Sequence, residues 1–464
     1  MDLKSFRNKK ITIMGLGLHG GGVGATKFFA NLGAKVLVTD LKSREELAPS
    51  LAQLKDFKIE YVLGRHRKED FKNTDLIIKN PAVPFNSPFV EVARNYKIPI
   101  ETQTSLFFKL CKGEIIGITG TKGKSTVGTL IYNFLKSEAK KVILAGNIRI
   151  AALEKLKEIR KDDQVILELS SFQLENLRMS PKIALITNIL EDHLDRYKNM
   201  RDYIRAKEEI FKSQKPEDFL ILNYDDKISR SLAKKAKSQV YFYSKKKIKE
   251  RDGFKMGSYQ KEKKIYLDKK QICKIEDIKL KGPHNIENVL AAVTVAGIKK
   301  VPPEKIKNVL RKFKGLPFRL EFVKNINGVL FYNDTCATCP EATIAALNSF
   351  EKKVILIAGG AEKNLPFENL AKEIAEKVKI LVLLEGKATK RLKRKVNEVL
   401  KKSKEKIPIN TTKSMQEAVN LSFKMAKKGD IVLLSPACSS FGMFLHEFDR
   451  GEKFNKAVKE LKKT

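Results

Sequence analysis

One glycine-rich segment has the residue types that bind phosphate. Gly117-Ile-Thr-Gly-Thr-Lys-Gly-Lys-Ser125 overlaps the apolar run Glu114–Thr119 and precedes a helical pattern from about Lys124. A loop between a strand and a helix presents backbone amides to phosphate oxygens, with the lysine on the β- and γ-phosphates and the serine hydroxyl on Mg²⁺. The first glycine comes one residue earlier than in the usual G-x-x-x-x-G-K-S spacing. We therefore interpret the segment as a variant phosphate-binding loop.

A second glycine-rich turn lies near the N-terminus. Gly15-Leu-Gly-Leu-His-Gly20 matches G-x-G-x-x-G after the apolar run Ile11–Gly15, and Asp40 closes the next strand-like run, Ala34–Asp40. Glycines at this spacing let a diphosphate approach a helix N-terminus, and the later acidic residue contacts a ribose or base. The motif does not say which nucleotide. A dinucleotide dehydrogenase, a protein that binds another nucleotide diphosphate and a purely structural turn all remain open.

Acidic residues and a histidine follow two further strand-like runs. Glu168 lies near the end of Val165–Leu169, and Glu191-Asp-His-Leu-Asp195 follows Ile183–Asn188. Because the carboxyl ends of strands in an open α/β sheet line the ligand crevice, we expect these residues to face the phosphate loop. Glu168 and His193 then suit Mg²⁺ coordination and phosphate contact. A polar turn or helix cap is the alternative for Glu-Asp-His.

Strands and helices must alternate to position these residues. Strand-like runs alternate with helical patterns along the chain, which predicts α/β domains with mostly parallel sheets. Further runs lie at Asp75–Lys79, Pro99-Ile100, Val329–Asn333, Val354–Ala358, Ile380–Leu384 and Ile431–Leu434. Residues Lys245–Lys274 predict a small antiparallel excursion. The economical division is three domains, 1–112, 113–314 and 315–464.

The composition excludes several classes of protein. The 464 residues include 92 Lys+Arg and 54 Asp+Glu, a net charge of +38, with 42% hydrophobic residues, so each domain can bury a core. No run of about 18 apolar residues predicts a transmembrane segment. Five scattered cysteines favour a reducing compartment, and we expect a cytoplasmic protein. The lysines are spread along the chain without interleaved aromatics, so we expect no nucleic-acid partner; a basic nucleic-acid-binding ATPase is the alternative from another class.

Five motifs, taken in order, resemble those of the Mur ligases. They are Gly-x-Thr-Gly-Thr-x-Gly-Lys-Ser, Glu168-Leu-Ser-Ser-Phe-Gln-Leu-Glu175, Asn188-x-x-Glu-Asp-His-Leu-Asp195, Gly282-Pro-His-Asn-Ile-Glu-Asn288 and Gly315-Leu-Pro-x-Arg319. The second motif resembles the D-glutamate-adding branch of the family. The likeness covers essentially the whole chain, through Ser435-Pro-Ala-Cys-Ser-Ser-Phe441.

The resemblance implies a fold and an activity. The fold is an N-terminal Rossmann-like UDP-binding domain, a central P-loop-type ATPase domain and a C-terminal Rossmann-like domain that binds the amino acid. The activity is addition of D-glutamate to UDP-N-acetylmuramoyl-L-alanine with ATP and Mg²⁺, through an acyl phosphate, in peptidoglycan precursor synthesis. We expect a monomer that acts on these small molecules. Another Mur-type ligase or a folylpolyglutamate-type ligase is the nearest alternative, and the UDP-type first domain speaks against the folate enzyme.

The resemblance also implies the site residues. The UDP-substrate would contact Gly15, Gly17, Leu18, His19, Asp40, Asn80, Asn147, Ser170, Ser171 and Gln173. ATP would contact Gly120, Thr121, Lys122, Gly123, Lys124, Ser125, Thr126, Asn285, Asn288, Arg319 and Asp334. D-glutamate would contact Thr338, Lys363, Ser440 and Phe441. The catalytic residues would be Lys124, Glu168, His193 and Lys207, and the metal would be held by Ser125, Glu168, His193 and, if it is carbamylated, Lys207.

Three positions need separate comment. Lys207 occupies the place of a lysine that the family carbamylates, which requires a neutral amine that captures CO₂; without the family it is one of many helical lysines. Lys122 stands where asparagine is frequent in the family, and Cys336 stands where some members have a substrate-contacting lysine, which leaves one acceptor contact open. Cys336 and Cys339 form a lone C-x-x-C, and no second pair completes a zinc site.

Overall fold

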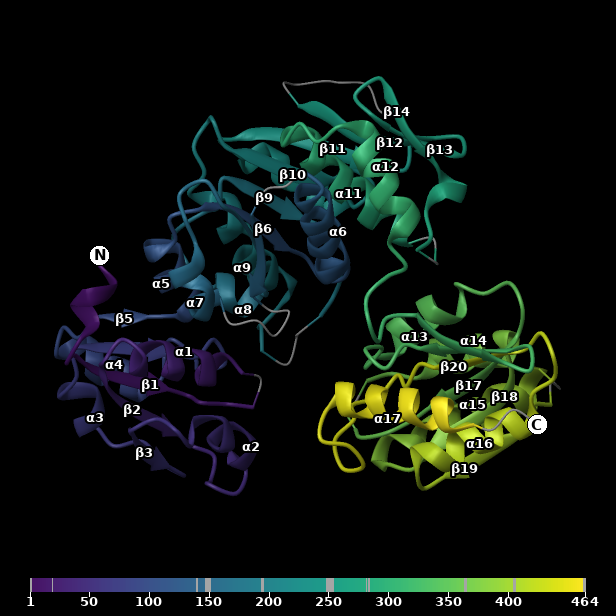
Figure 1. Ribbon diagram of the computed structural model, residues 1–464. Helices are drawn as coiled ribbons and strands as arrows, with labels where there is room; N and C mark the ends of the chain where they lie inside the picture. The colour runs from purple at the N-terminus through teal and green to yellow at the C-terminus, as the bar shows by residue number, and fades with distance from the viewer. Residues whose placement is uncertain are drawn as a thin grey trace. The chain divides into compact units, whose positions relative to one another are not determined.

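The computed structural model describes residues 2–18, 20–138, 141–146, 152–192, 196–247, 254–280, 282, 284–362, 365–403 and 406–461. The chain divides into two compact units (Figure 1). The first unit is Met1–Asp277 with Glu287–Arg311, and the second is Ile278–Ile286 with Lys312–Thr464. The first unit holds two β-sheets and the second holds one.

The first sheet is parallel and has five strands in the order β3-β2-β1-β4-β5. The strands are β1 (Lys10–Met14), β2 (Lys35–Asp40), β3 (Ile59–Leu63), β4 (Leu76–Lys79) and β5 (Ile100–Glu101), and the helices are α1 (Gly21–Ala30), α2 (Ala48–Leu51), α3 (Glu69–Lys72), α4 (Pro88–Asn95) and α5 (Gln103–Leu110). The strand order reverses between β1 and β4, and ligands bind at the carboxyl ends of strands at such a switch point. The turns after β1 and β4 begin with Gly15 and Asn80.

The second sheet has nine strands in the order β14-β13-β12-β11-β10-β9-β6-β8-β7. Its strands are β6 (Glu114–Thr119), β7 (Val142–Gly146), β8 (Gln164–Glu168), β9 (Ile183–Ile186), β10 (Phe219–Asn223), β11 (Gln239–Ser244), β12 (Lys255–Lys261), β13 (Lys264–Leu267) and β14 (Lys270–Lys274). Its helices are α6 (Lys124–Lys136), α7 (Ala152–Lys155), α8 (Ser171–Leu174), α9 (Met200–Lys212), α10 (Lys227–Ser231), α11 (His284–Ile298) and α12 (Pro303–Lys312). Strands β12, β13 and β14 pair antiparallel, which confirms the predicted excursion, and the other pairs are parallel.

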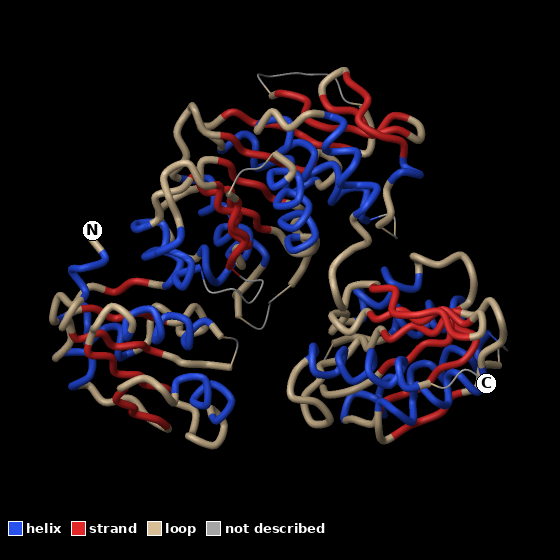
Figure 2. The backbone as a smooth tube through the Cα atoms, in the orientation of Figure 1, coloured by secondary structure: helices blue, strands red, loops and turns tan. Residues whose placement is uncertain are grey.

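The third sheet has the order β15-β16-β20-β17-β18-β19, with only β15 antiparallel. Its strands are β15 (Glu321–Ile326), β16 (Val329–Asn333), β17 (Val354–Ala358), β18 (Val378–Leu384), β19 (Ile409–Thr412) and β20 (Ile431–Leu434), and its helices are α13 (Pro340–Leu347), α14 (Glu368–Lys377), α15 (Lys387–Ser403), α16 (Met415–Met425) and α17 (Glu447–Glu460). Helices cover both faces of this sheet (Figure 2). Because side chains alternate along a strand, Leu356 packs in a core with α14 and α15, while Ile355 and Ile357 pack in a core with α16 and α17.

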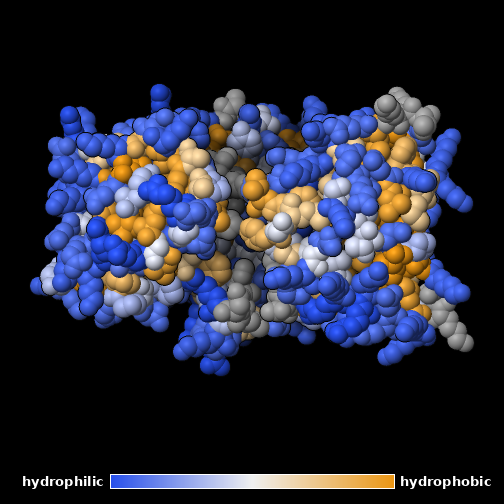
Figure 3. Space-filling view, turned by 90° about the horizontal axis from the view of Figure 1, so that it is seen from below, coloured by the Kyte–Doolittle hydropathy of each residue, from blue (hydrophilic) through white to orange (hydrophobic). Residues whose placement is uncertain are grey.

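Parallel pairing dominates all three sheets, which confirms the predicted α/β class with mostly parallel sheets. Within the described ranges, no helix has both the length and the apolar character needed to cross a membrane. The face in Figure 3 is mostly hydrophilic, with hydrophobic residues gathered in patches. The hydrophilic residues are drawn in blue, and their extent is consistent with the 92 Lys+Arg of the chain.

Candidate active site

The phosphate loop joins β6 to α6 through two glycines with positive φ. Gly120 has φ 142° and Gly123 has φ 89°, a region that other residues rarely adopt. A Cβ on Gly120 would lie 1.9 Å from Thr187 Oγ1, and a Cβ on Gly123 would lie 2.2 Å from Asn288 Oδ1. Gly123 is the N-cap of α6, and no side chain caps the helix. The glycine loop thus leads directly into the N-terminus of α6, the end of a helix at which anions bind.

The segment after β9 holds the phosphate loop from one side. Asn188 accepts hydrogen bonds from the Lys122 amide through Oδ1 and from the Thr121 amide through its carbonyl, each at 2.9 Å. The Thr187 hydroxyl donates to the Lys122 carbonyl at 2.6 Å. The Lys122 ammonium lies 3.5 Å from Asp192 Oδ2. Thr187 is a loop contact that the sequence motifs did not single out.

Two lysines donate to the same carbonyl of this loop. Lys124 Nζ donates to the carbonyls of Gly120 at 2.9 Å and Thr121 at 3.1 Å, and Lys207 Nζ donates to that of Gly120 at 3.0 Å. Lys207, on α9, is 1% exposed and lies over the Tyr203 ring. Burial and then the charge of Lys124 lower the pKa of Lys207 well below its usual value. The site therefore favours the neutral amine that reaction with CO₂ requires.

Glu168 lies beside the phosphate loop in the sheet. The register pairs Ile118 of β6 with Glu168 of β8, so the carboxylate is at the strand end where the loop begins. Glu168 is buried, and Ser125 lies in the first turn of α6. Both offer oxygen donors, which Mg²⁺ prefers, so these residues fit that ion. His193 lies outside the described residues, and within the described ranges no three His, Cys, Asp or Glu side chains form a metal-binding group.

Helix α11 contacts the phosphate loop through Asn288. Asn288 is buried against Gly123, and Asn285 is buried one turn earlier, where its amide donates to the Gly282 carbonyl at 3.0 Å. Asn223, at the end of β10, lies between two of these segments: its Nδ2 donates to the Thr187 carbonyl at 3.3 Å and lies 3.4 Å from Glu287 Oε2. Asn223 is a further residue of this site that the sequence motifs missed.

Asp40 has a role in the structure that its position in the sequence did not indicate. Its Oδ2 accepts hydrogen bonds from the amides of Leu16 at 2.8 Å and Gly17 at 3.0 Å, and its Oδ1 accepts from Lys42 at 2.9 Å. The Asp40 carboxylate thus stabilises the conformation of the first glycine turn by accepting from its backbone amides. Leu18 is half exposed on this turn, and His19 lies outside the described residues.

The turn after β4 lies against the first glycine turn. Asn80 Nδ2 donates to the Gly15 carbonyl at 3.1 Å, and Asn80 Oδ1 accepts from the Ala82 amide at 3.0 Å. A Cβ on Gly15 would lie 2.9 Å from Asn80 Cβ, and one on Gly17 would lie 3.6 Å from Asn80 Nδ2. The structure thus brings Gly15, Gly17 and Asn80 together at the switch point of the first sheet.

The residues expected at the muramoyl-alanine end form the start of α8. Ser170 and Gln173 make a capping box: Gln173 Oε1 accepts from the Ser170 amide at 2.9 Å, and Ser170 Oγ accepts from the Gln173 amide at 3.3 Å. Ser171 is buried. Asn147 lies outside the described residues. The Ser170 and Gln173 side chains therefore shape the loop after β8.

In the second unit, Asp334 is a buried carboxylate beneath a loop. Its Oδ2 accepts from the Ser435 hydroxyl at 2.9 Å and its Oδ1 accepts from the Leu320 amide at 3.2 Å. Burial raises the pKa of Asp334 to about 7. The exposed Arg319 lies between Phe318 and Leu320, which have φ of 64° and 47°. Asp334 therefore anchors the loop that presents Arg319.

Two neighbouring loops of the second unit carry the expected D-glutamate residues. The Ala437 amide donates to the Ala337 carbonyl at 2.9 Å, which joins loops 334–339 and 435–441. The fully buried Arg450 donates to Thr335 Oγ1 at 3.0 Å and to the carbonyls of Thr335 at 2.9 Å and Cys438 at 3.1 Å. Thr338 and Ser440 thus lie on joined loops, beside Phe441, which is exposed. Lys363 lies outside the described residues.

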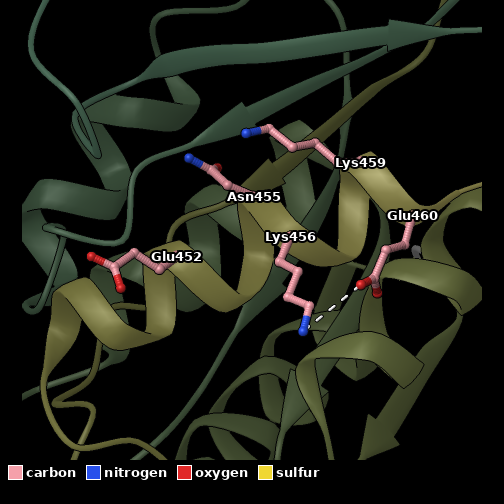
Figure 4. Close-up of a pocket in the computed structure, with 5 residues that line it drawn as sticks. All are labelled: Glu452, Asn455, Lys456, Lys459 and Glu460. Atoms are coloured by element: carbon pink, nitrogen blue, oxygen red, sulfur yellow. Dashed lines mark ion pairs between the residues drawn. The ribbon is translucent and has the colours of Figure 1, made fainter.

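A shallow hollow of the second unit lies away from these residues. It is lined by Glu452, Asn455, Lys456, Lys459 and Glu460, all on one helix, α17 (Figure 4). Lys456 is 3.9 Å from Glu460, an exposed pair of the kind that adds little stability. None of the predicted site residues lines this hollow, so it is not the candidate site.

Family models match the chain in three successive segments. Residues 9–102 match the Mur ligase MurD-like N-terminal domain, residues 118–296 match the Mur ligase middle domain, and residues 318–438 match the Mur ligase, glutamate ligase domain. These segments contain the first glycine turn, the phosphate loop and the Asp334 loop, respectively.

Relatives match over their full length. A protein of Roseiflexus sp. (strain RS-1), named UDP-N-acetylmuramoylalanine--D-glutamate ligase, is 43% identical over 98% of this chain and 99% of its own. A protein of the same name from Caldanaerobacter subterraneus subsp. tengcongensis is 38% identical over the whole of both chains. Among solved structures, UDP-N-acetylmuramate-alanine ligase MurC from Thermotoga maritima has a TM-score of 0.64 at 18% identity over 98% of this chain and 100% of its own, which shows a shared fold. The three-domain fold and the full-length relatives show that the chain belongs to the Mur ligase family.

Proposed function

We infer that the chain is an ATP-dependent ligase that joins D-glutamate to UDP-N-acetylmuramoyl-L-alanine in peptidoglycan precursor synthesis. The observation that carries this inference is the full-length likeness to ligases of that name, in a chain whose phosphate loop has the glycines and Lys124 that ATP binding needs. The shared domain organisation supports ATP as the energy source. Small molecules are thus the substrates of the enzyme.

The proposed reaction has two steps. The carboxylate of the L-alanyl group attacks the γ-phosphorus of ATP, which forms an acyl phosphate and releases ADP. The amine of D-glutamate then attacks the acyl carbon, an amide bond forms, and inorganic phosphate leaves with a proton lost from the amine. No protein nucleophile is needed, because positioning and electrostatic stabilisation supply most of the catalysis in phosphoryl transfer.

The residues of the phosphate loop have distinct roles in this proposal. The amides at the start of α6 and the Lys124 ammonium bind the phosphates and stabilise the charge that develops on the γ-phosphoryl group. Ser125, Glu168 and His193 would hold Mg²⁺, which when bound offsets phosphate charge. Lys207, buried beside Lys124, would add a carbamate ligand once its neutral amine has reacted with CO₂.

The remaining contacts are proposed by domain. We propose domain limits of 1–112, 113–314 and 315–464, with the UDP-substrate on Gly15, Gly17 and Asn80, and D-glutamate on Thr338 and Ser440. We also propose that the enzyme acts as a monomer in the cytoplasm. The grouping of the glycine turn with Asn80 supports the UDP-substrate contacts, and the joining of the two loops of the second unit supports the D-glutamate contacts.

The test is phosphate release from ATP and Mg²⁺ with UDP-MurNAc-L-alanine, with and without D-glutamate, and with L-glutamate as the control acceptor. We expect release only when both substrates are present, with a strong preference for D-glutamate. Lys124→Ala should lower kcat/KM by about 10²-fold or more, whereas Lys136→Ala, exposed at the far end of the same helix, should leave it unchanged. Phosphate release with another acceptor would show that the enzyme adds a different amino acid. No release with any UDP-muramoyl substrate would overturn the proposal.

A further inference from the structure

An arginine that the predicted site does not include joins the first sheet domain to the central one. Arg196 directly follows Asp195, the last residue of the Glu-Asp-His-Leu-Asp motif. Its guanidinium donates to the carbonyls of Pro81 and Ala82, both at 2.9 Å. It also lies 3.3 Å from Glu175 Oε2 and 4.6 Å from the Phe172 ring. All of these residues belong to the first compact unit.

A second basic side chain, that of Lys79, contacts the same turn. Lys79 is 1% exposed, and its Nζ donates to the Asn80 carbonyl at 3.1 Å and to the Val83 carbonyl. All four carbonyls of residues 80–83 thus accept from Lys79 or Arg196. Charged donors make stronger hydrogen bonds than neutral ones. Lys79 fixes the turn within its own domain, whereas Arg196 fixes it to the central domain.

The turn that Arg196 holds is the one that contacts the first glycine turn. Asn80 bonds to the Gly15 carbonyl and accepts from the Ala82 amide, so a movement of residues 80–83 moves the wall of the proposed UDP-substrate site. Pro81 lies within the turn and Pro84 directly follows it, and the two rings restrict the backbone further. The orientation of this wall is therefore set partly by a side chain of the other domain.

The same arginine packs on a row of aromatic rings that reaches the phosphate loop. The row consists of Phe172, Tyr197 and Tyr203: the first two rings are stacked at 5.8 Å, and the last two are 5.4 Å apart. Tyr203 Oη lies 3.1 Å from Thr121 Oγ1, within the phosphate loop. Contiguous packing thus connects the 80–83 turn to the phosphate loop through Arg196.

We propose that Arg196 is a positioning residue that fixes the turn of residues 80–83 relative to the phosphate loop, so that the bound UDP-substrate presents its carboxylate to ATP. The identity of the ligand rests on the proposed function. Arg196 acts through the Pro81 and Ala82 carbonyls and not on the reacting atoms. Loss of this contact would leave the ATP site intact while the UDP-substrate is misplaced.

The kinetic test compares Arg196→Gln with Arg196→Lys and the control Arg205→Gln, whose side chain is 67% exposed on α9. Arg196→Gln should lower kcat/KM for UDP-MurNAc-L-alanine by about tenfold or more, the effect of losing two charged hydrogen bonds, with the KM for ATP changed by less than about twofold. Arg196→Lys keeps the charge but lacks the two guanidinium nitrogens that reach both carbonyls. It should therefore recover only part of the lost kcat/KM. Arg205→Gln should behave as wild type. Equal losses for both substrates, or no loss, would overturn the proposal.

A second arm needs no ligase activity. The amides of Ala82 and Val83 are bonded to Asn80 within the turn, and their hydrogen exchange in the ligand-free protein reports its opening. We expect faster exchange at both amides in Arg196→Gln, with the amides of β1 unchanged. Unchanged exchange would show that Arg196 does not act through the turn and would overturn the proposal even if activity fell. If wild type forms no product, the proposed function fails, and this arm alone decides the role of Arg196.

Discussion

Lys124 and Lys207 donate to one carbonyl, yet the two side chains differ in exposure. Lys124 is partly exposed, whereas Lys207 is 1% exposed and faces the Lys124 ammonium. Burial and a like charge both disfavour an ammonium group. Carbamylation of the neutral amine releases a proton and places a negative charge beside the Lys124 cation. The pair therefore has a built-in electrostatic preference for a carboxylate at Lys207.

Lys207 is expected to carry a carbamate in solution. Protein equilibrated with ¹³C-bicarbonate should give a carbamate resonance that Lys207→Arg lacks, because a guanidinium stays charged and does not capture CO₂. Lys212→Arg, exposed at the end of the same helix, is the matched control and should keep the signal. A carbamate resonance that persists in Lys207→Arg would assign the modification to another lysine.

Asp334 should make stability fall as pH rises. Its folded pKa of about 7 lies above the ordinary value of 3.8, so between these values the folded protein holds a proton that the unfolded chain releases. The stabilisation is complete below the lower pKa and is lost as pH rises through the higher one. Asn resembles the protonated form, so the stability of Asp334→Asn relative to wild type should increase from pH 5 to pH 8, as measured by urea unfolding.

Asp430→Asn is the control for the pH experiment. The Asp430 carboxylate pairs with Lys379 at 2.7 Å, and its pKa is lowered despite burial, chiefly by the hydrogen bond to Lys379. Its stabilisation is present above the unfolded pKa, so the cost of this substitution should be the same at pH 5 and pH 8. A pH-independent difference for Asp334→Asn would contradict a raised pKa at that position.

At the scale of elements, the start of α6 is set by glycine and not by a capping side chain. Gly123 has φ 89° and lies against Asn288, whereas Gly128, one turn later in the same helix, is helical. A Cβ on Gly128 would lie 3.4 Å from Leu144 Cδ1, an ordinary contact. Gly123 therefore has a backbone conformation that favours glycine, whereas Gly128 has one that any helical residue adopts.

Substitution by alanine should separate these two glycines. In Gly123→Ala, the alanine has to adopt a left-handed conformation and its Cβ clashes with Asn288. This substitution should therefore destabilise the protein by about 1–3 kcal/mol and raise the KM for ATP. Gly128→Ala should keep the wild-type KM and gain up to about 1 kcal/mol from helix propensity. Thermal unfolding and ATP titration measure both effects. Equal behaviour of the two variants would show that the φ of Gly123 does not constrain the loop.

At the scale of the whole molecule, the second unit has the parts of an independent domain. Residues 312–464 contain all six strands of the third sheet, and hydrophobic cores cover both of its faces. This length is typical of a single domain. Phe454 and Val458 of α17 lie in the core that Ile355 and Ile357 also enter.

Residues 312–464 should therefore fold when produced alone. We expect cooperative thermal unfolding followed by circular dichroism. A fragment of residues 312–446, which lacks α17, should unfold without cooperativity or aggregate, because it exposes that core. If the longer fragment shows no cooperative transition, stability of the second unit depends on the first.

The strands that the sequence predicted best are those with unbroken apolar runs. Strands β6, β16, β17 and β20 have the predicted limits, because buried parallel strands are apolar on both faces. Strands β3, β7, β10, β11, β15 and β19 were not predicted individually. Strand β15 lies at a sheet edge, and only Ile326 among its residues is buried, so its apolar patterning is weak.

The sequence by itself determined the α/β class, the phosphate loop and the family, because each depends on residue types at fixed short spacings. Only the tertiary structure decided which side chains reach those motifs. Asp40 contacts a turn 23 and 24 residues away, Lys207 reaches a carbonyl 87 residues away, and Arg196 reaches carbonyls 114 and 115 residues away. Burial and hydrogen-bond partners at such separations follow from sheet order and packing, which local spacing does not encode. The lowered pKa of Lys207 and the position of Arg196 therefore belong to the fold and not to any motif.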